Sequence, residues 1–141
     1  MTAVTLRLDI VSAEKKIFSG EAEMVFVTGE MGELGIAPGH SQLLTNLQPG
    51  YVRALLPAKK EEVFYISGGM LEVQPYIVSV LADTAMRADD IDEAAAHLAE
   101  EHARNALAGK VSAMDVARAT AELAEAAAQI RAIQRLKKRA K

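Results

Sequence analysis

The sequence contains no cysteine. Disulfide bridges, thiolate metal sites, iron–sulfur clusters and cysteine nucleophiles are therefore excluded, and the composition fits a reducing compartment. No segment could cross a bilayer as a helix, because prolines, His40 and amides interrupt the longest run without Asp, Glu, Lys or Arg, residues 34–52. Residues 1–16 alternate instead of forming an apolar block, so no secretory signal is predicted. These features predict a soluble cytoplasmic protein.

An excess of positive charge is also missing. The chain carries 16 basic and 19 acidic residues, for a formal net charge of −3. Proteins that bind nucleic acid usually show a basic excess, so we expect no nucleic-acid partner. Half of the 141 residues are apolar and a quarter are charged, which excludes a disordered chain. This length predicts one domain of ordinary size, or a small domain with an appendage.

The second part of the chain lacks what the first part has. All six aromatic residues, all four prolines and eight of the nine glycines precede residue 88. Alanine then supplies 18 of the last 54 residues. Aromatic and β-branched residues with turn residues indicate strands, whereas alanine with Leu, Glu, Gln and Arg indicates helices. We therefore predict a sheet domain over residues 1–87 and a helical domain over residues 88–141.

Short apolar runs between turn residues indicate the strands of the first domain. Leu6, Leu8 and Ile10 alternate with polar residues, as expected of a half-buried strand. The further candidate strands are residues 21–28, 33–36, 43–47, 51–56, 63–67, 70–73 and 77–82. Glycine and proline separate them, and they leave no room for crossover helices. This spacing predicts an antiparallel sandwich or barrel.

Two capping patterns indicate the helices of the second domain. Asp90 with Glu93 predicts a helix from about residue 91 to 107, which a left-handed Gly109 would close. Ser112 with Asp115 predicts a second helix that can run to residue 139. Because the connection between them is short, we expect an antiparallel hairpin.

The second helix has a narrow apolar seam. Its members repeat at helical spacing and include several small residues: Val116, Ala119, Leu123, Ala126, Ile130 and Ile133. Alanine adds little buried area, so the hairpin should have high helical propensity and a weak tertiary grip. It could then leave its docking site while staying helical.

No motif in the sequence indicates a catalytic or metal site. There is no phosphate-binding loop, and nothing resembles a nucleophile–base pair. His97, Glu101 and His102 could share a helix surface, but their spacing is not H-E-x-x-H and a solvated polar face explains them better. The acidic cluster at residues 89–93 is better explained by helix capping than by catalysis. We predict no catalytic residue, no metal, no cofactor and no enzymatic activity of the chain alone.

Charge is segregated along the helical domain. Residues 88–128 carry three basic and nine acidic residues, whereas residues 129–141 carry six basic residues and no acidic one. Favourable placement at a helix C-terminus needs only one or two cations. A basic tip that seeks an acidic partner surface is the second interpretation. The glycine-rich segment 29–40, which bears both apolar and charged groups, is typical of a contact surface.

Several segments carry a resemblance to a known family. They are Val11–Glu14, Phe18–Gly20, Gly32–His40, Tyr65–Gly69, Leu71–Pro75, Val80–Thr84, Asp90–Ala94 and Ala121–Ala124. In this order the chain strongly resembles the epsilon subunits of bacterial F-type ATP synthases, most closely the proteobacterial branch. The resemblance covers essentially the whole chain.

The resemblance implies an α+β fold, with an N-terminal antiparallel β-sandwich followed by a C-terminal antiparallel two-helix hairpin. It implies a non-catalytic rotor subunit of the central stalk, which helps couple proton flow to ATP synthesis. The implied partners are the gamma subunit, the ring of c subunits, and the alpha and beta subunits. The implied location is peripheral, on the cytoplasmic face of the bacterial inner membrane, without insertion into the membrane.

The resemblance also implies roles for individual residues. Glu33 would face the c-ring and His40 would lie near gamma. The helices of this family can fold down on the sandwich or extend along gamma, where they inhibit ATP hydrolysis. The basic tail would then face acidic segments of the beta subunits, and its members are Arg131, Arg135, Lys137, Lys138 and Arg139.

One departure from the family concerns nucleotide binding. Some members bind ATP through the pattern Ile/Leu-Asp-x-x-Arg-Ala at the first helix. Here Ile91 and Asp92 match, but Ala95 stands where the arginine belongs. Because a guanidinium–phosphate contact is among the strongest hydrogen bonds, we expect only weak ATP binding.

Composition and periodicity alone leave a second reading open. A stand-alone interaction module, with a β-sandwich and a mobile helical arm, would show the same pattern. Co-purification with the alpha, beta and gamma subunits would separate the two. A carbohydrate-binding or enzymatic sandwich is disfavoured, because aromatics are scarce and no acid–base pair is evident.

Overall fold

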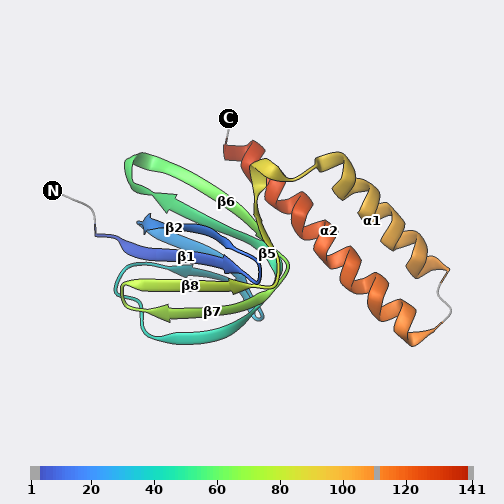
Figure 1. Ribbon diagram of the computed structural model, residues 1–141, viewed down its shortest axis with the longest axis horizontal. Helices are drawn as coiled ribbons and strands as arrows, with labels where there is room; N and C mark the ends of the chain where they lie inside the picture. Colours follow the sequence, from blue (N-terminus) through green and yellow to red (C-terminus); the bar gives the residue numbers. More distant parts are fainter. Residues whose placement is uncertain (1–3, 110–111, 140–141) are drawn as a thin grey trace.

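The computed structural model describes residues 4–109 and 112–139, without the side chain of Arg139. In this part of the chain a layered β domain comes first and two helices follow (Figure 1). The strands are β1 (Leu6–Ser12), β2 (Lys16–Ala22), β3 (Met24–Gly29), β4 (Gly32–Ile36), β5 (Leu43–Leu56), β6 (Lys60–Ile66), β7 (Gly69–Gln74), β8 (Ile77–Ala82) and β9 (Ala85–Arg87). The helices are α1 (Glu93–Ala108) and α2 (Ala113–Arg139), with short 3₁₀ turns η1 (Pro57–Lys59) and η2 (Ala88–Asp90). The predicted fold class, a sandwich followed by a two-helix hairpin, is confirmed.

Two layers of strands enclose the main core. One layer has the order β2-β1-β8-β7-β5, and the other joins β4, β3, β5, β6 and β9. Strand alternation turns Leu8, Ile10, Val25, Val52 and Phe64 into this space, where each is fully buried. The whole of this cluster comes from residues 6–85, so the sandwich buries its large side chains without help from the helices.

Strand β5 belongs to both layers. Residues 43–47 pair with β7, and residues 50–56 pair with β6. The sequence predicted two strands here, because Pro49-Gly50 looked like a break. The proline falls between the two pairing regions, where its missing N–H costs no ladder hydrogen bond. The chain therefore stays extended and passes from one layer to the other.

The strand pairing also departs from a purely antiparallel sheet at one place. β1 runs parallel to β8, with Leu8 opposite Val78 and Ile10 opposite Val80. These strands are far apart in the sequence, so no hairpin turn forces them to be antiparallel. A second difference concerns the strand predicted at residues 21–28. The structure divides this segment between the end of β2 and strand β3.

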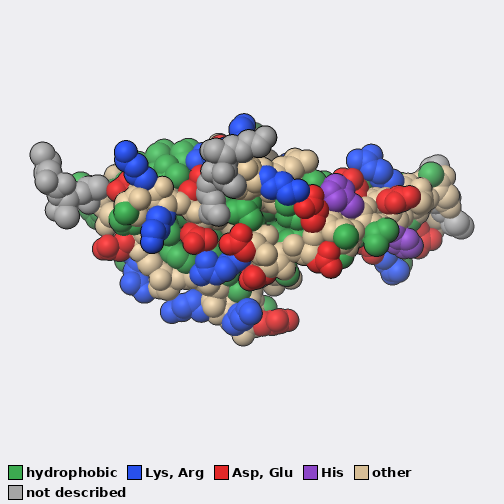
Figure 2. All heavy atoms as spheres, turned by 90° about the horizontal axis from the view of Figure 1, so that it is seen from above, with side chains coloured by type: hydrophobic (Ala, Val, Ile, Leu, Met, Phe, Trp, Pro, Cys, Tyr) green, Lys and Arg blue, Asp and Glu red, His purple; other side chains and the backbone are tan. Residues whose placement is uncertain are grey.

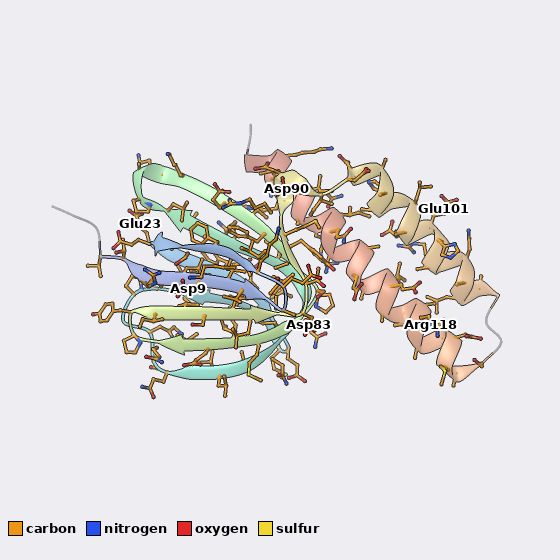
Figure 3. All side chains as sticks on the ribbon, in the orientation of Figure 1. Asp9, Glu23, Asp83, Asp90, Glu101 and Arg118 are labelled. Atoms are coloured by element: carbon orange, nitrogen blue, oxygen red, sulfur yellow. The ribbon has the colours of Figure 1, made fainter. Side chains whose placement is uncertain are left out.

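The first helix begins later than the capping pattern predicted. Asp90 ends the turn η2, and Ile91 and Asp92 remain extended. The carboxylate of Asp92 accepts the N–H of Ala95 at 3.1 Å, so Asp92 and not Asp90 is the N-cap. Figure 3 shows Asp90 at the junction between sandwich and hairpin. Gly109 is also not left-handed, with φ −98°, because its N–H continues the helical pattern to Asn105.

The second helix agrees with its predicted start. The Ser112 hydroxyl accepts the N–H of Asp115 at 3.1 Å. α1 and α2 then pack as an antiparallel hairpin, with α2 between α1 and the sandwich (Figure 1). The predicted seam is largely buried, through Ala119, Ala126, Ile130 and Ile133 of α2.

Candidate functional site

Helix α2 has a second apolar stripe, which rests on the sandwich. Ala128 and Ala132 are fully buried against Val63 and Tyr65 of β6 and against Ala88. The partly buried residues around them are Tyr51, Met86, Ile91 and Leu136. We call this contact the docking face. It contains few large aliphatic side chains, so it buries little apolar area compared with the sandwich core.

Tyr65 is the largest fully buried side chain on the docking face and is 2% exposed. Burial raises the pKa of its phenol to about 12, and the negative charge of Glu125 on α2 adds to the rise. A side-chain hydrogen bond with Gln129 of α2 opposes the rise. Two of these influences come from α2, so this pKa reports whether the helix is docked.

The basic tail points back onto the chain itself. Arg131 donates from Nη2 to the Pro49 carbonyl oxygen at 3.3 Å. Arg135 donates from Nε and Nη2 to one oxygen of Glu61 at 3.4 and 3.3 Å. Lys138 is exposed. The side chain of Arg139 lies outside the described part of the structure.

Lys137 joins the two ends of the hairpin. Its Nζ lies 2.9 Å from the carboxylate of Glu93, in the first turn of α1. That hydrogen bond is the main cause that lowers the pKa of Glu93, and the nearby Lys137 and His97 charges act in the same direction. His97 Nε2 lies 3.8 Å from the same carboxylate. Two of the tail cations, Arg135 and Lys137, therefore contact acidic groups of the sandwich and of α1, respectively, while the hairpin is docked.

The residues matched to the nucleotide pattern serve other purposes here. Asp92 caps α1, and Ile91 packs partly against the docking face. Ala95 is exposed on α1, so an arginine would fit at this position. Within residues 4–109 and 112–139, no group of three or more His, Asp or Glu side chains is placed to hold a metal ion.

Glu33 and His40 lie at different ends of β4. Glu33 is exposed near the start of the strand, beside the turn that carries the almost fully exposed Met31. His40 follows the end of β4, with its Nδ1 2.7 Å from the Ser41 carbonyl oxygen. The structure does not bring these two residues together, as expected if they meet different partners.

An exposed apolar group on the sandwich was missed from the sequence. Met70 and Leu81 face each other across β7 and β8, and Leu44 lies on the same outer face of neighbouring β5. They are 39%, 50% and 65% exposed, respectively. We call these three residues the apolar strip. A signal was present, since each has an apolar neighbour in the sequence and strand alternation must turn one of the two outward.

Charge is mixed rather than gathered on the face of the molecule that Figure 2 shows. Figure 2 shows basic and acidic side chains interspersed over the sandwich and the hairpin on the face seen from above. Among the described helices, none is long and apolar enough to span a membrane. The apolar strip, the docking face and the basic tail are the candidate functional surfaces of the described part of the chain.

Comparison with known proteins gives family matches on both domains. Residues 5–88 match the β-sandwich domain of ATP synthase delta/epsilon chains, and residues 89–134 match their long α-helix domain. The ATP synthase epsilon chain of Nitrosococcus oceani is 57% identical over 137 residues, which cover 97% of this chain and 98% of that one.

Solved structures share the fold. One is from the Euglena gracilis mitochondrial ATP synthase (OSCP/F1/c-ring), with a TM-score of 0.74, 19% identity, and coverage of 100% of this chain and 84% of that chain. Another is from the Tetrahymena thermophila mitochondrial ATP synthase (central stalk/c-ring), with a TM-score of 0.59, 9% identity, and coverage of 96% and 98%.

Proposed function

The chain belongs to the family of ATP synthase delta/epsilon chains, and we propose that it is a non-catalytic rotor subunit of the central stalk. In this role it helps couple proton flow to ATP synthesis and restrains ATP hydrolysis through its helical hairpin. Its place is peripheral, on the cytoplasmic face of the bacterial inner membrane. The division at residues 87 and 88 then separates a stalk-binding part from a regulatory part.

The sandwich supplies the stalk contacts in this proposal. The apolar strip is a group of exposed large side chains on one face of the sandwich, and such groups mark protein–protein contacts. We assign it, with His40, to the gamma subunit. Glu33 and the neighbouring exposed turn at Met31 are assigned to the c-ring, at the other end of β4.

The regulatory role rests on one observation above all: the fully buried residues that α2 brings to the docking face are alanines, while Arg135 and Lys137 of the basic tail are held by acidic groups of the same chain. A small apolar contact can open without unfolding either domain. Opening would free the tail cations for acidic surfaces of the beta subunits. The alpha and beta subunits would then meet the hairpin only in its open state.

Neutralising the tail tests this role. Complexes in which Arg131, Arg135, Lys137, Lys138 and Arg139 are all changed to Gln should hydrolyse ATP several-fold faster than wild type. Exposed charge contacts are worth only ~0–1 kcal/mol each, so a single change should do little. Steady-state hydrolysis of the assembled complex is the measurement, and the gain should shrink as salt screens the wild-type contacts.

Two further complexes complete this experiment. Arg104→Gln with Arg118→Gln removes cations from the hairpin outside the tail and should leave hydrolysis unchanged. Deleting the hairpin should activate at least as much as the five substitutions. If deletion activates and the five-Gln chain still inhibits like wild type, the helices block sterically and the charge mechanism is wrong. If neither activates, the hairpin is not inhibitory.

ATP should bind the isolated chain poorly. Without an arginine at position 95, we expect a dissociation constant of about 1 mM or weaker, since a charged hydrogen bond contributes roughly 1.5–3 kcal/mol. Calorimetry on the full chain measures this directly. Ala95→Arg should tighten binding, whereas Ala94→Arg, which adds the same charge at the adjacent exposed position, should not. Micromolar binding by the unmodified chain would contradict the expectation.

A further inference from the structure

Glu61 lies where the sandwich, the docking face and the basic tail meet. Besides the two hydrogen bonds from Arg135, the same carboxylate oxygen lies 3.5 Å from Nε of Arg53 on β5. The guanidinium of Arg53 lies over the Phe26 ring, 3.9 Å from its centroid, which helps fix its position. The carboxylate is thus held in place by the sandwich and presented to α2.

These three charged groups are shielded from solvent. The side chains of Glu61, Arg53 and Arg135 are only 13%, 17% and 27% exposed. Screening by water and salt is weaker for partly buried charges than for exposed ones. The Lys137–Glu93 pair is much more open, with side chains 63% and 44% exposed. Among the described tail contacts, the one at Glu61 is therefore where loss of a partner should matter most.

We propose that Glu61 is a latch that holds the hairpin on the sandwich and withholds the basic tail from other acidic surfaces. The tail guanidinium of Arg135 cannot bind Glu61 and an acidic partner at the same time. Undocking must therefore break this contact before Arg135 becomes available. The latch itself is argued from contacts within this chain. Only its expected effect on ATP hydrolysis by the assembled complex rests on the proposed inhibitory role.

Strand alternation supplies a matched control at the next residue. Residues 61, 63 and 65 of β6 face α2, whereas Glu62 and Phe64 face the other way. Glu62 pairs with Arg87 at 3.3 Å, at the end of β9. Glu61→Gln and Glu62→Gln therefore make the same change in charge and size, but only the first touches the docking contact.

Thiol labelling of the isolated full chain can measure how often the hairpin undocks. The chain has no cysteine of its own, so an introduced cysteine is the one thiol that reacts. Ala132→Cys places a thiol at a position that is 0% exposed on the docking face. At low reagent concentration its labelling rate follows the open population. A second reporter, Ala54→Cys, lies in the sandwich core and reports global unfolding.

In the Ala132→Cys background, Glu61→Gln should raise the labelling rate about three- to tenfold, as expected for losing a charge-assisted, partly shielded contact. Glu62→Gln should leave the rate unchanged. Arg135→Gln should match Glu61→Gln, and combining the two should add little because both remove one interaction. Labelling of the Ala54→Cys reporter should stay slow in all of them.

Several results would overturn the latch. It is wrong if neither Glu61→Gln nor Arg135→Gln speeds labelling at position 132, or if Glu62→Gln speeds it equally. If Glu61→Gln also accelerates labelling at position 54, the sandwich itself has been weakened through Arg53. In that case the labelling rate of Arg135→Gln at position 132 tests the latch, because this variant leaves the Arg53–Glu61 pair in place.

The assembled complex separates this inference from the proposed function. Glu61→Gln leaves every tail cation present and frees the hairpin, so it should lower ATP hydrolysis below wild type. This direction is opposite to that expected for the five-Gln tail. Faster labelling of the isolated chain with unchanged hydrolysis would establish the latch and overturn the inhibitory role. Unchanged labelling would overturn the latch whatever the hydrolysis rate.

Discussion

Replacing Gly69 by alanine should cost the sandwich about 4 kcal/mol or more in free energy of unfolding, enough to prevent folding of a marginally stable domain. Gly69 begins β7 with φ +143°, and a Cβ built on it would overlap the Leu81 carbonyl oxygen. Leu81 lies within the paired strand β8, so the obstructing atom belongs to backbone that cannot rotate away. Gly69 also pairs with Leu47 of β5, so the damage should spread through three strands.

Gly32→Ala supplies the control for backbone strain. Gly32 also has a positive φ, +128°, but a Cβ there would meet no atom within 4 Å. Strain alone should cost about 1–2 kcal/mol. Urea unfolding followed by far-ultraviolet circular dichroism measures both variants. Equal losses at the two positions would show that the close approach to Leu81 does not limit stability.

The sequence revealed local structure well because local signals decide it. Alternation at Leu6, Leu8 and Ile10 places these side chains in the core as predicted. The change of composition predicted sheet first and helices second, and the last strand ends at Arg87. The Ser112 pattern located the start of α2, because a side-chain cap acts within one helical turn.

Features that depend on long-range pairing were not predictable in the same way. Nothing near Pro49 in the sequence shows that the proline falls between two pairing regions of one continuous strand. The parallel contact of β1 with β8 joins segments that no local pattern connects. The sequence pattern assigned the cap to Asp90, because Glu93 follows three residues later. In the structure Asp90 instead ends the turn η2, which is closed by a hydrogen bond from the Ile91 N–H to the Ala88 carbonyl oxygen, and Asp92 caps α1.

The candidate site also has features that the sequence predicted and features that emerge only from the fold. The sequence pointed to the basic tail as a unit, since residues 129–141 hold six cations and no acidic residue, more than a helix terminus needs. It did not reveal that Ala128 and Ala132 form a docking stripe, because alanine in an alanine-rich helix carries no distinctive signal. The contact between Arg135 and Glu61 spans 74 residues and emerges only from the fold. The roles of Glu33 and His40 stay predictions.

A chain that ends at Ala88 should fold, and the pKa of Tyr65 in it should fall from about 12 toward the usual phenol value of about 10. The main core lies wholly within residues 6–85, so the sandwich keeps its large apolar contacts. The truncation removes the burial by α2 and the charge of Glu125, both of which raise this pKa, together with Gln129, which opposes them. Burial and the charge of Glu125 have larger effects than the Gln129 hydrogen bond, so the pKa of Tyr65 should fall when all three are removed.

The same shift sets how docking depends on pH. In the docked chain the phenol has a pKa of about 12, above its value in the undocked state, so docking favours the protonated form. The stabilisation is complete below about pH 10 and is lost as the pH rises through about 12. Docking of the full chain should therefore weaken as the pH rises from about 10 to about 12, and acidification should have no such effect through Tyr65.

Absorbance titration of phenolate near 295 nm measures both chains, and Tyr65→Phe assigns the signal among the three tyrosines. The full chain should show a phenol with a pKa of about 12 that disappears in Tyr65→Phe, and in the truncated chain the Tyr65 phenol should ionise at a lower pH. Circular dichroism of the truncated chain at pH 7 must retain the sheet spectrum for the comparison to count as undocking. A truncated chain without sheet structure would mean that α2 completes the core, and a late-ionising Tyr65 in a folded truncated chain would mean that the sandwich, not the hairpin, buries the phenol.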